Sequence, residues 1–210
     1  SGTWERQPLP GRFAFKFEVE FGWGPETRLF PDAALKVWEG SLQVPGHLMG
    51  VEKLWNSFGQ QILEWRDDRC DFRLTTHRGT ETGKWMGPSQ VRRESLVFEV
   101  EGGIDDVLTL TVDGEQYALP VRMLLQGTRI YAQYSQCERR IIKKFGPTPH
   151  YRDDFIWHCA FKFRVRRAVP SPAYTLNESF TTTLDAGSQY RLRVWLKNGD
   201  AAWTSPIFCR

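Results

Sequence analysis

The stretch FAFKFEVEF at residues 13–21 decides the fold, because the character of its side chains alternates from one position to the next. The odd positions are all aromatic or branched apolar residues, namely Phe13, Phe15, Phe17, Val19 and Phe21. The even positions include Lys16, Glu18 and Glu20. Since successive side chains of a β-strand point to opposite faces, this stretch predicts a strand whose odd face is buried and whose even face meets water.

The same two-residue period recurs along most of the chain. It predicts further strands at 35–44, 48–55, 60–65, 71–77, 95–102, 107–114, 128–135, 155–165 and 190–199. Turn sequences separate these runs, among them VPGH at 44–47, GPTP at 146–149 and the pairs Asp113-Gly114 and Asn198-Gly199. PVRMLLQG at 120–127 predicts at most one short helix. The pattern predicts an all-β fold, an antiparallel two-sheet sandwich of jelly-roll type, with residues 1–210 as a single domain. Two lobes divided near residue 102 are the alternative.

Composition narrows the classes of partner. The net charge of +3 is small, and no RNA- or DNA-binding motif is present, so we expect no nucleic-acid partner. No run reaches the roughly 18 apolar residues of a membrane helix, and the first residues resemble no export signal, so we expect no membrane partner. An export signal already removed, or a longer parent protein, would leave the same sequence, so the localisation stays open, with the periplasm or the cell exterior as one alternative.

The four cysteines, Cys70, Cys137, Cys159 and Cys209, lack the paired short spacing of a zinc site. Buried thiols are the simplest interpretation. If the protein is exported, one disulfide is the alternative, and the best candidate is Cys137–Cys159 across the two arms of a hairpin.

The end of the chain resembles a known kind of segment. The residues that carry the resemblance are Tyr190, Arg193, Val194, Gly199, Ala202, Trp203, Thr204, Ser205, Pro206 and Ile207, together with WEGSLQV at 38–44. They are similar to the closing β-rich segment of large, uncharacterised bacterial proteins, some of which carry a metal-dependent phosphoesterase core of the PHP type upstream and end in a phrase like AWSSPIW. The resemblance implies an accessory β-sandwich domain, or a free-standing relative of one, with any metal chemistry elsewhere.

Catalytic signatures are weak. His47, His77, His150 and His158 are not spaced to share a metal on a strand, so we expect no metal and no cofactor. Pairs of glutamates at i and i+2 suit a jelly-roll glycoside hydrolase, but an ordinary solvent-facing sheet has the same pattern. Tyr151, His158, Lys162 and Arg164 suit a polysaccharide lyase without a diagnostic spacing.

Two features favour binding. Nine Lys or Arg residues fall between 137 and 167, and in FKFRVRR the basic residues Lys162, Arg164 and Arg166 alternate with apolar ones, which predicts one basic strand face. That face either protects an edge strand or binds an anion. Trp23 and Trp85 lie in Gly- and Pro-containing loops, and Trp195 is out of phase with its apolar neighbours and so predicted to face water. We assign Trp38, Trp55, Trp157 and Trp203 to packing.

These residues predict a non-catalytic accessory or binding module, with Trp23, Trp85, Trp195, Lys162, Arg164 and Arg166 as its ligand-binding residues and carbohydrate or an acidic polymer as its ligand. A jelly-roll hydrolase or lyase acting on an acidic polysaccharide is one alternative. A structural domain that packs on the catalytic domain of a parent protein is the other.

Overall fold

The computed structural model describes residues 11–25, 27, 29–53, 60–78, 91–147, 153–174, 179, 181–195 and 201–209. By residue contacts the chain forms two compact units, Ser1–Thr175 and Leu176–Arg210. Gly102 and Gly103, where the sequence offered a division into lobes, end a strand inside the first unit. The two units are described separately below.

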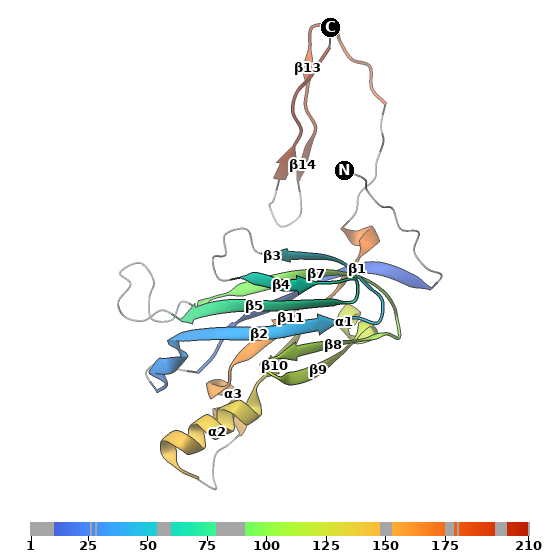
Figure 1. Ribbon diagram of the computed structural model, residues 1–210. Coiled ribbons are helices and arrows are strands. Elements are labelled where there is room, and N and C mark those ends of the chain that lie inside the picture. The colour runs from blue at the N-terminus through green and yellow to red at the C-terminus, as the bar shows by residue number, and fades with distance from the viewer. Residues whose placement is uncertain are drawn as a thin grey trace, which may run out of the picture. The chain divides into compact units, whose positions relative to one another are not determined.

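The first unit is a sandwich of two antiparallel sheets (Figure 1). Sheet A has the order β10 (Arg129–Ala132), β11 (Lys162–Val165), β1 (Arg12–Trp23), β7 (Glu94–Gly103) and β3 (His47–Lys53), with β12 (Val169–Pro170) also paired to β1. Sheet B has the order β4 (Gln61–Trp65), β5 (Arg69–Arg78), β2 (Leu35–Gln43), β8 (Val107–Val112) and β9 (Glu115–Pro120), with β6 (Val91–Arg92) paired to β5. The chain passes from sheet to sheet between β1, β2, β3 and β4, as in a jelly roll. The prediction of an all-β, two-sheet sandwich is confirmed.

The core lies between the sheets and is built from the apolar face of each strand. Phe15, Phe17, Val19 and Phe21 of β1 are buried, as their alternation predicts, and Phe13 packs against them at the edge. Trp38 of β2 is fully buried, its ring centroid lies 5.1 Å from that of Phe21, and its indole N–H donates to the Thr76 hydroxyl at 2.8 Å. Packing of this kind, rather than local propensity, fixes the register of the strands.

The tight turn between β8 and β9 has the geometry its sequence predicts. Asp113 and Gly114 have φ angles of 49° and 84°, and both values lie in the left-handed region that a two-residue hairpin of this type requires. The turn sets the Asp113 side chain against β2, where it becomes part of the site described below.

Helices α2 and α3 correct the sequence prediction. Helix α1 (Val121–Gln126) matches the short helix predicted at 120–127, but no helix was predicted where α2 (Tyr134–Phe145) and α3 (Asp153–Cys159) lie. The strands predicted at 128–135 and 155–165 overlap these two helices only in part. The strand predicted at 128–135 stops at Ala132, and the one predicted at 155–165 begins only at Lys162. In α2 the buried residues Cys137 and Ile141 are four apart, which is helical spacing.

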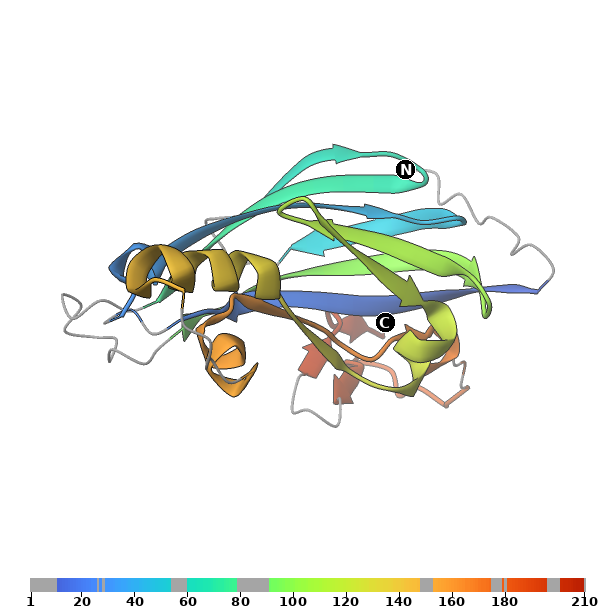
Figure 2. The same ribbon diagram turned by 90° about the horizontal axis from the view of Figure 1, so that it is seen from below.

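The helices lie at the ends of the sandwich, and two short 3₁₀ turns accompany the strands. Figures 1 and 2 show α1 at one end of the sheets and α2 with α3 at the other. The 3₁₀ turns are η1 (Pro31–Ala34), just before β2, and η2 (Ser171–Ala173), just after β12. No helix in the part of the chain that the structure describes is long and apolar enough to cross a membrane.

The second unit contains two small antiparallel pairs. Strand β13 (Gln189–Tyr190) pairs with β16 (Ile207–Phe208), and β14 (Arg193–Trp195) pairs with β15 (Ala201–Trp203). Trp203 was predicted to pack, but its relative exposure is 64%, so that prediction is wrong. A pair of short strands has too little area to bury a tryptophan by itself.

Candidate functional site

The structure brings three of the predicted ligand-binding residues together on the outer face of sheet A. Trp23 ends β1, and Arg164 and Arg166 belong to β11 or follow it directly. They surround Glu20, which faces Arg164 across the pairing of β1 with β11. We call Glu20, Trp23, Arg93, Arg164 and Arg166 the arginine cluster.

The carboxylate of Glu20 is the centre of the arginine cluster. Arg164 donates to Glu20 Oε2 from Nε at 3.1 Å and from Nη2 at 2.5 Å, and Arg166 donates to the same oxygen at 3.2 and 2.9 Å. Arg93 approaches the other oxygen at 3.4 Å. Glu20 was predicted to face water, but only 6% of its side chain is exposed. Its negative charge is therefore enclosed by three guanidinium groups, which compensate its loss of hydration.

Trp23 lies against the same arginines. The guanidinium carbons of Arg93 and Arg164 each lie 4.9 Å from a ring centroid of Trp23, within the range of a cation–π contact. The Trp23 indole therefore already makes cation–π contacts with Arg93 and Arg164. In the arginine cluster, most donor groups and the tryptophan already have partners within the fold.

The other predicted binding residues lie elsewhere. Lys162 donates to the carbonyl of Trp157 in the last turn of α3 at 2.5 Å and lies 5.1 Å from the Trp157 ring centroid, so it stabilises that helix end. Trp85 lies outside the described residues, and Trp195 belongs to β14 of the second unit, where only its backbone is described.

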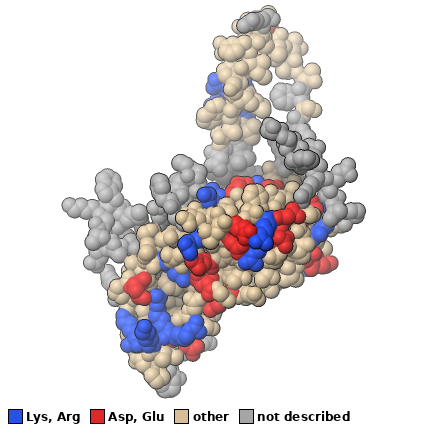
Figure 3. All heavy atoms as spheres, in the orientation of Figure 1, with Lys and Arg blue, Asp and Glu red and all other residues tan. Residues whose placement is uncertain are grey.

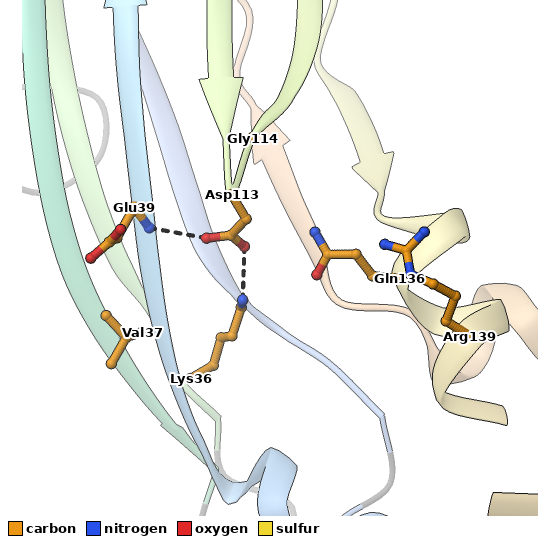
Figure 4. Close-up of a pocket in the computed structure, with 7 residues that line it drawn as sticks. All are labelled: Lys36, Val37, Glu39, Asp113, Gly114, Gln136 and Arg139. Atoms are coloured by element: carbon orange, nitrogen blue, oxygen red, sulfur yellow. Dashed lines mark hydrogen bonds and ion pairs between the residues drawn. The ribbon is translucent and has the colours of Figure 1, made fainter. Parts of the chain in front are cut away.

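A second polar site, which the sequence did not single out, is a cleft at the α2 end of the sandwich. It is a hollow of about 690 Å³ lined by β2, the β8–β9 turn and α2. Its lining residues are Lys36, Val37, Glu39, Asp113, Gly114, Gln136 and Arg139 (Figure 4). We call it the α2 cleft. Figure 4 shows Gln136 and Arg139 reaching from α2 toward the side formed by β2 and the turn.

A hydrogen-bonded network makes the floor of the α2 cleft rigid. Asp113 accepts the Lys36 ammonium at 2.7 Å, the buried Gln133 amide at 2.8 Å and the backbone N–H of Glu39 at 3.1 Å. Lys36 also lies over the rings of Trp38 and Phe161, at 5.1 and 5.2 Å. Asp113 and Lys36 therefore neutralise each other, and their positions are fixed by the core beneath them.

The opposite wall of the α2 cleft carries charge without compensation. Arg139 and Lys143 are exposed, four residues apart on α2, and neither has an ion-pair partner among the described residues. Arg140 pairs with Asp32 of η1 at 2.7 Å, and Lys144 donates to the backbone carbonyl of Leu29. The space-filling view shows the resulting basic patch at the α2 end (Figure 3). Arg139 is thus a cation facing an open, polar hollow.

A smaller hollow of about 190 Å³ adjoins the α2 cleft and shares Lys36, Val37 and Gln136 with it. Its other lining residues are Leu35, Cys137, Arg140, Cys159 and Phe161. Burial raises the pKa of the Cys137 thiol to about 11, with a contribution from the neighbouring Cys159, and burial also raises the pKa of Cys159. Both groups are therefore neutral thiols near pH 7. We call this space the inner hollow.

The described residues contain no group of three or more His, Cys, Asp or Glu side chains placed to hold a metal ion. What the α2 cleft offers chemically is a guanidinium fork from Arg139, an amide from Gln136 and a fixed carboxylate–ammonium pair beneath them. This set of donors and acceptors matches a ligand that carries both negative charge and hydroxyl groups.

The sequence indicated an excess of basic residues in this region, but the prediction placed the binding face on a different element. The basic excess between residues 137 and 167 was noted, but the predicted binding face was placed on FKFRVRR at 161–167, whereas the first four cations of the stretch belong to α2. The contribution of Asp113 could not be anticipated, because a turn residue reaches β2 only through the pairing of β8 with β2.

Comparison with known proteins adds no relative: no protein-family model, no curated protein and no solved structure matches this chain.

Proposed function

We propose that this chain is a non-catalytic binding module that holds an acidic polysaccharide in the α2 cleft. The observation that carries the proposal is Arg139, an exposed cation that lines a hollow of about 690 Å³ and has no ion-pair partner among the described residues. Arg139 differs in this respect from Arg164 and Arg166 of the arginine cluster, which both form ion pairs with Glu20. A guanidinium left open at a hollow favours an anionic ligand.

Carboxylated sugar is the ligand class that the α2 cleft fits best. A uronate residue presents a planar carboxylate, which the fork of Arg139 can hold with two hydrogen bonds. Its hydroxyls are served by the Gln136 amide and by the oxygens of Glu39, which also line the α2 cleft. Lys143, one turn along α2, extends the positive charge in the direction of a longer chain.

The test is binding of polygalacturonate to the wild-type chain and to Arg139→Gln, measured by isothermal titration at low ionic strength. We expect the substitution to weaken binding about fivefold to tenfold, since one charge-assisted contact contributes roughly 1 kcal/mol. Binding should nearly vanish at about 1 M NaCl, where charges are screened beyond about 3 Å.

The matched control is Arg122→Gln, which removes another exposed arginine, on α1, that pairs with Asp105 at the other end of the sandwich. It should bind like wild type. Neutral dextran should not bind, and dextran sulfate tests whether carboxylate is preferred over charge in general. Equal binding by the Arg139 and Arg122 variants would overturn the proposal.

We propose a structural role for the second unit as a second candidate function, namely that it packs on another domain of a parent protein. Leu192, Trp203, Ile207 and Phe208 are all exposed in it. Exposed apolar groups of this kind mark surfaces that associate.

Trp203→Ser with Ile207→Ser tests this second role. The double variant should leave the unfolding midpoint of the first unit unchanged to within about 1 °C, because surface changes cost little. It should lower the apolar-dye binding of the isolated chain. An undiminished dye signal, or a large fall in the midpoint, would contradict an exposed docking surface.

A further inference from the structure

Two thiols meet where α3 packs against α2. Cys137 of α2 and Cys159 of α3 are both buried, and both line the inner hollow. The Cys137 thiol donates to the carbonyl of Ile156 at 3.4 Å. Ile156 precedes Cys159 by three residues, so both lie on the same face of α3, the face toward Cys137.

The other two cysteines are placed differently. Cys70 is fully buried in β5 of sheet B, where burial raises the pKa of its thiol to about 12, and Cys209 belongs to the second unit. Neither lines the inner hollow. Of the cysteines within the first unit, Cys137 and Cys159 are therefore the two that share one space.

We propose that Cys137 and Cys159 are a modification site: a small disulfide such as oxidised glutathione converts them into an intramolecular disulfide that ties α3 to α2. The thiolate of one cysteine attacks the reagent and forms a mixed disulfide, with release of one glutathione thiolate. The second cysteine, after losing its proton, attacks that mixed disulfide and releases the second glutathione. Two cysteine thiols are oxidised, and one glutathione disulfide is reduced to two glutathione thiols.

The surroundings determine how fast this reaction runs. Because burial raises the pKa of both thiols, the reactive thiolate is scarce at pH 7 and grows as the pH rises toward the pKa of Cys137 at about 11. The pair therefore suits a slowly formed, lasting cross-link rather than a rapid sensor. This inference does not depend on the proposed function, because cross-linking requires no ligand.

Mass spectrometry of the whole chain after treatment with oxidised glutathione tests the proposal. The intact mass should fall by two hydrogens, with no glutathione attached, and thiol titration in denaturant should fall from the four cysteines of the chain to two. After proteolysis, a peptide containing Cys137 should be joined to one containing Cys159. Bridging should be faster at pH 9 than at pH 7, and the oxidised chain should unfold roughly 5 °C higher than the reduced chain.

Two variants serve as matched controls. Cys70→Ser with Cys209→Ser should still lose two hydrogens, whereas Cys159→Ser should not, and it should instead hold one glutathione at Cys137. Since a serine at either buried site can weaken folding, the peptide map of the wild-type chain decides independently. A stable glutathione adduct on wild-type Cys137 or Cys159, an unaltered mass, or a bridge to Cys70 or Cys209 would overturn the proposal.

Discussion

Arg164 and Arg139 carry the same guanidinium group on the same sandwich, but their neighbours differ. Arg164 donates two hydrogen bonds to the Glu20 carboxylate and lies against the Trp23 ring, with its side chain 22% exposed. Arg139 projects from α2 into an open hollow and has no carboxylate partner among the described residues. The first contributes to the fold, and the second is available to a ligand.

The difference teaches that a count of basic residues does not locate a binding site. Both arginines fall in the same basic stretch, residues 137–167. What separates them is the register of β1 with β11, which sets Glu20 opposite Arg164, and the helical form of α2, which turns Arg139 outward. Compensation of charge, which only the fold reveals, separates a cation that is paired within the fold from one that is open to solvent.

Glu20→Gln is the substitution expected to have the largest effect on this comparison. Glutamine keeps the size of the side chain but removes the charge that three arginines share. Arg166 then keeps only Glu18, at 3.1 Å, and Arg93 and Arg164 lose the carboxylate partner that they have among the described residues. We expect the free energy of unfolding to fall by about 2–3 kcal/mol, measured by urea denaturation at pH 7.

Glu52→Gln is the matched control for Glu20→Gln. Glu52 of β3 pairs with Lys16 at 2.7 Å, but 62% of its side chain is exposed. Exposed ion pairs contribute little, so this variant should lose less than about 0.5 kcal/mol. Equal losses of unfolding free energy in the two variants would contradict the comparison, because the Glu20 carboxylate would then contribute no more than an exposed surface ion pair does.

The sandwich itself could be predicted because alternation is a local property. FAFKFEVEF shows which side chains of β1 are buried without any knowledge of its neighbours. Helices α2 and α3 could not be predicted in the same way. In FIWHCAFKFRV the apolar residues of α3 run directly into those of β11, so the strand pattern extends over residues that pack helically.

The candidate site was only partly predictable, since its contacts join distant positions. Glu20 and Arg164 are 144 residues apart, and Asp113 reaches Lys36 from the turn between β8 and β9. The prediction that Glu20 faces water followed correctly from its position on the outer face of β1, yet three arginines cover that face locally. Trp23 was predicted to lie in a loop, and Arg164 and Arg166 on a separate basic strand face, whereas Trp23 ends β1 and lies against Arg164.

Asp105 and Asp106 give a smaller, pH-dependent version of the same comparison within two adjacent residues. Asp106 accepts the Gly103 backbone N–H at 2.9 Å and the Arg12 guanidinium at 2.7 Å, and these contacts, the backbone bond first, lower its pKa. Asp105 pairs with Arg122 at 2.7 Å but is 82% exposed. The compensated carboxylate should therefore support the fold, and the exposed one should not.

The sign of the pH effect follows from the lowered pKa of Asp106. Its contribution to stability is present above its unfolded pKa of about 3.9 and is lost as the pH falls through the lower, folded pKa. Asp106→Asn should therefore cost about 1 kcal/mol at pH 7 and lose less additional stability than wild type between about pH 5 and pH 3. Urea midpoints across this range measure both effects, and Asp105→Asn should follow the wild-type curve. If the curve for Asp106→Asn runs parallel to the wild-type curve, the contacts with Gly103 and Arg12 do not stabilise the charged form of Asp106. Compensation within the fold would then not be what separates structural charges from exposed ones.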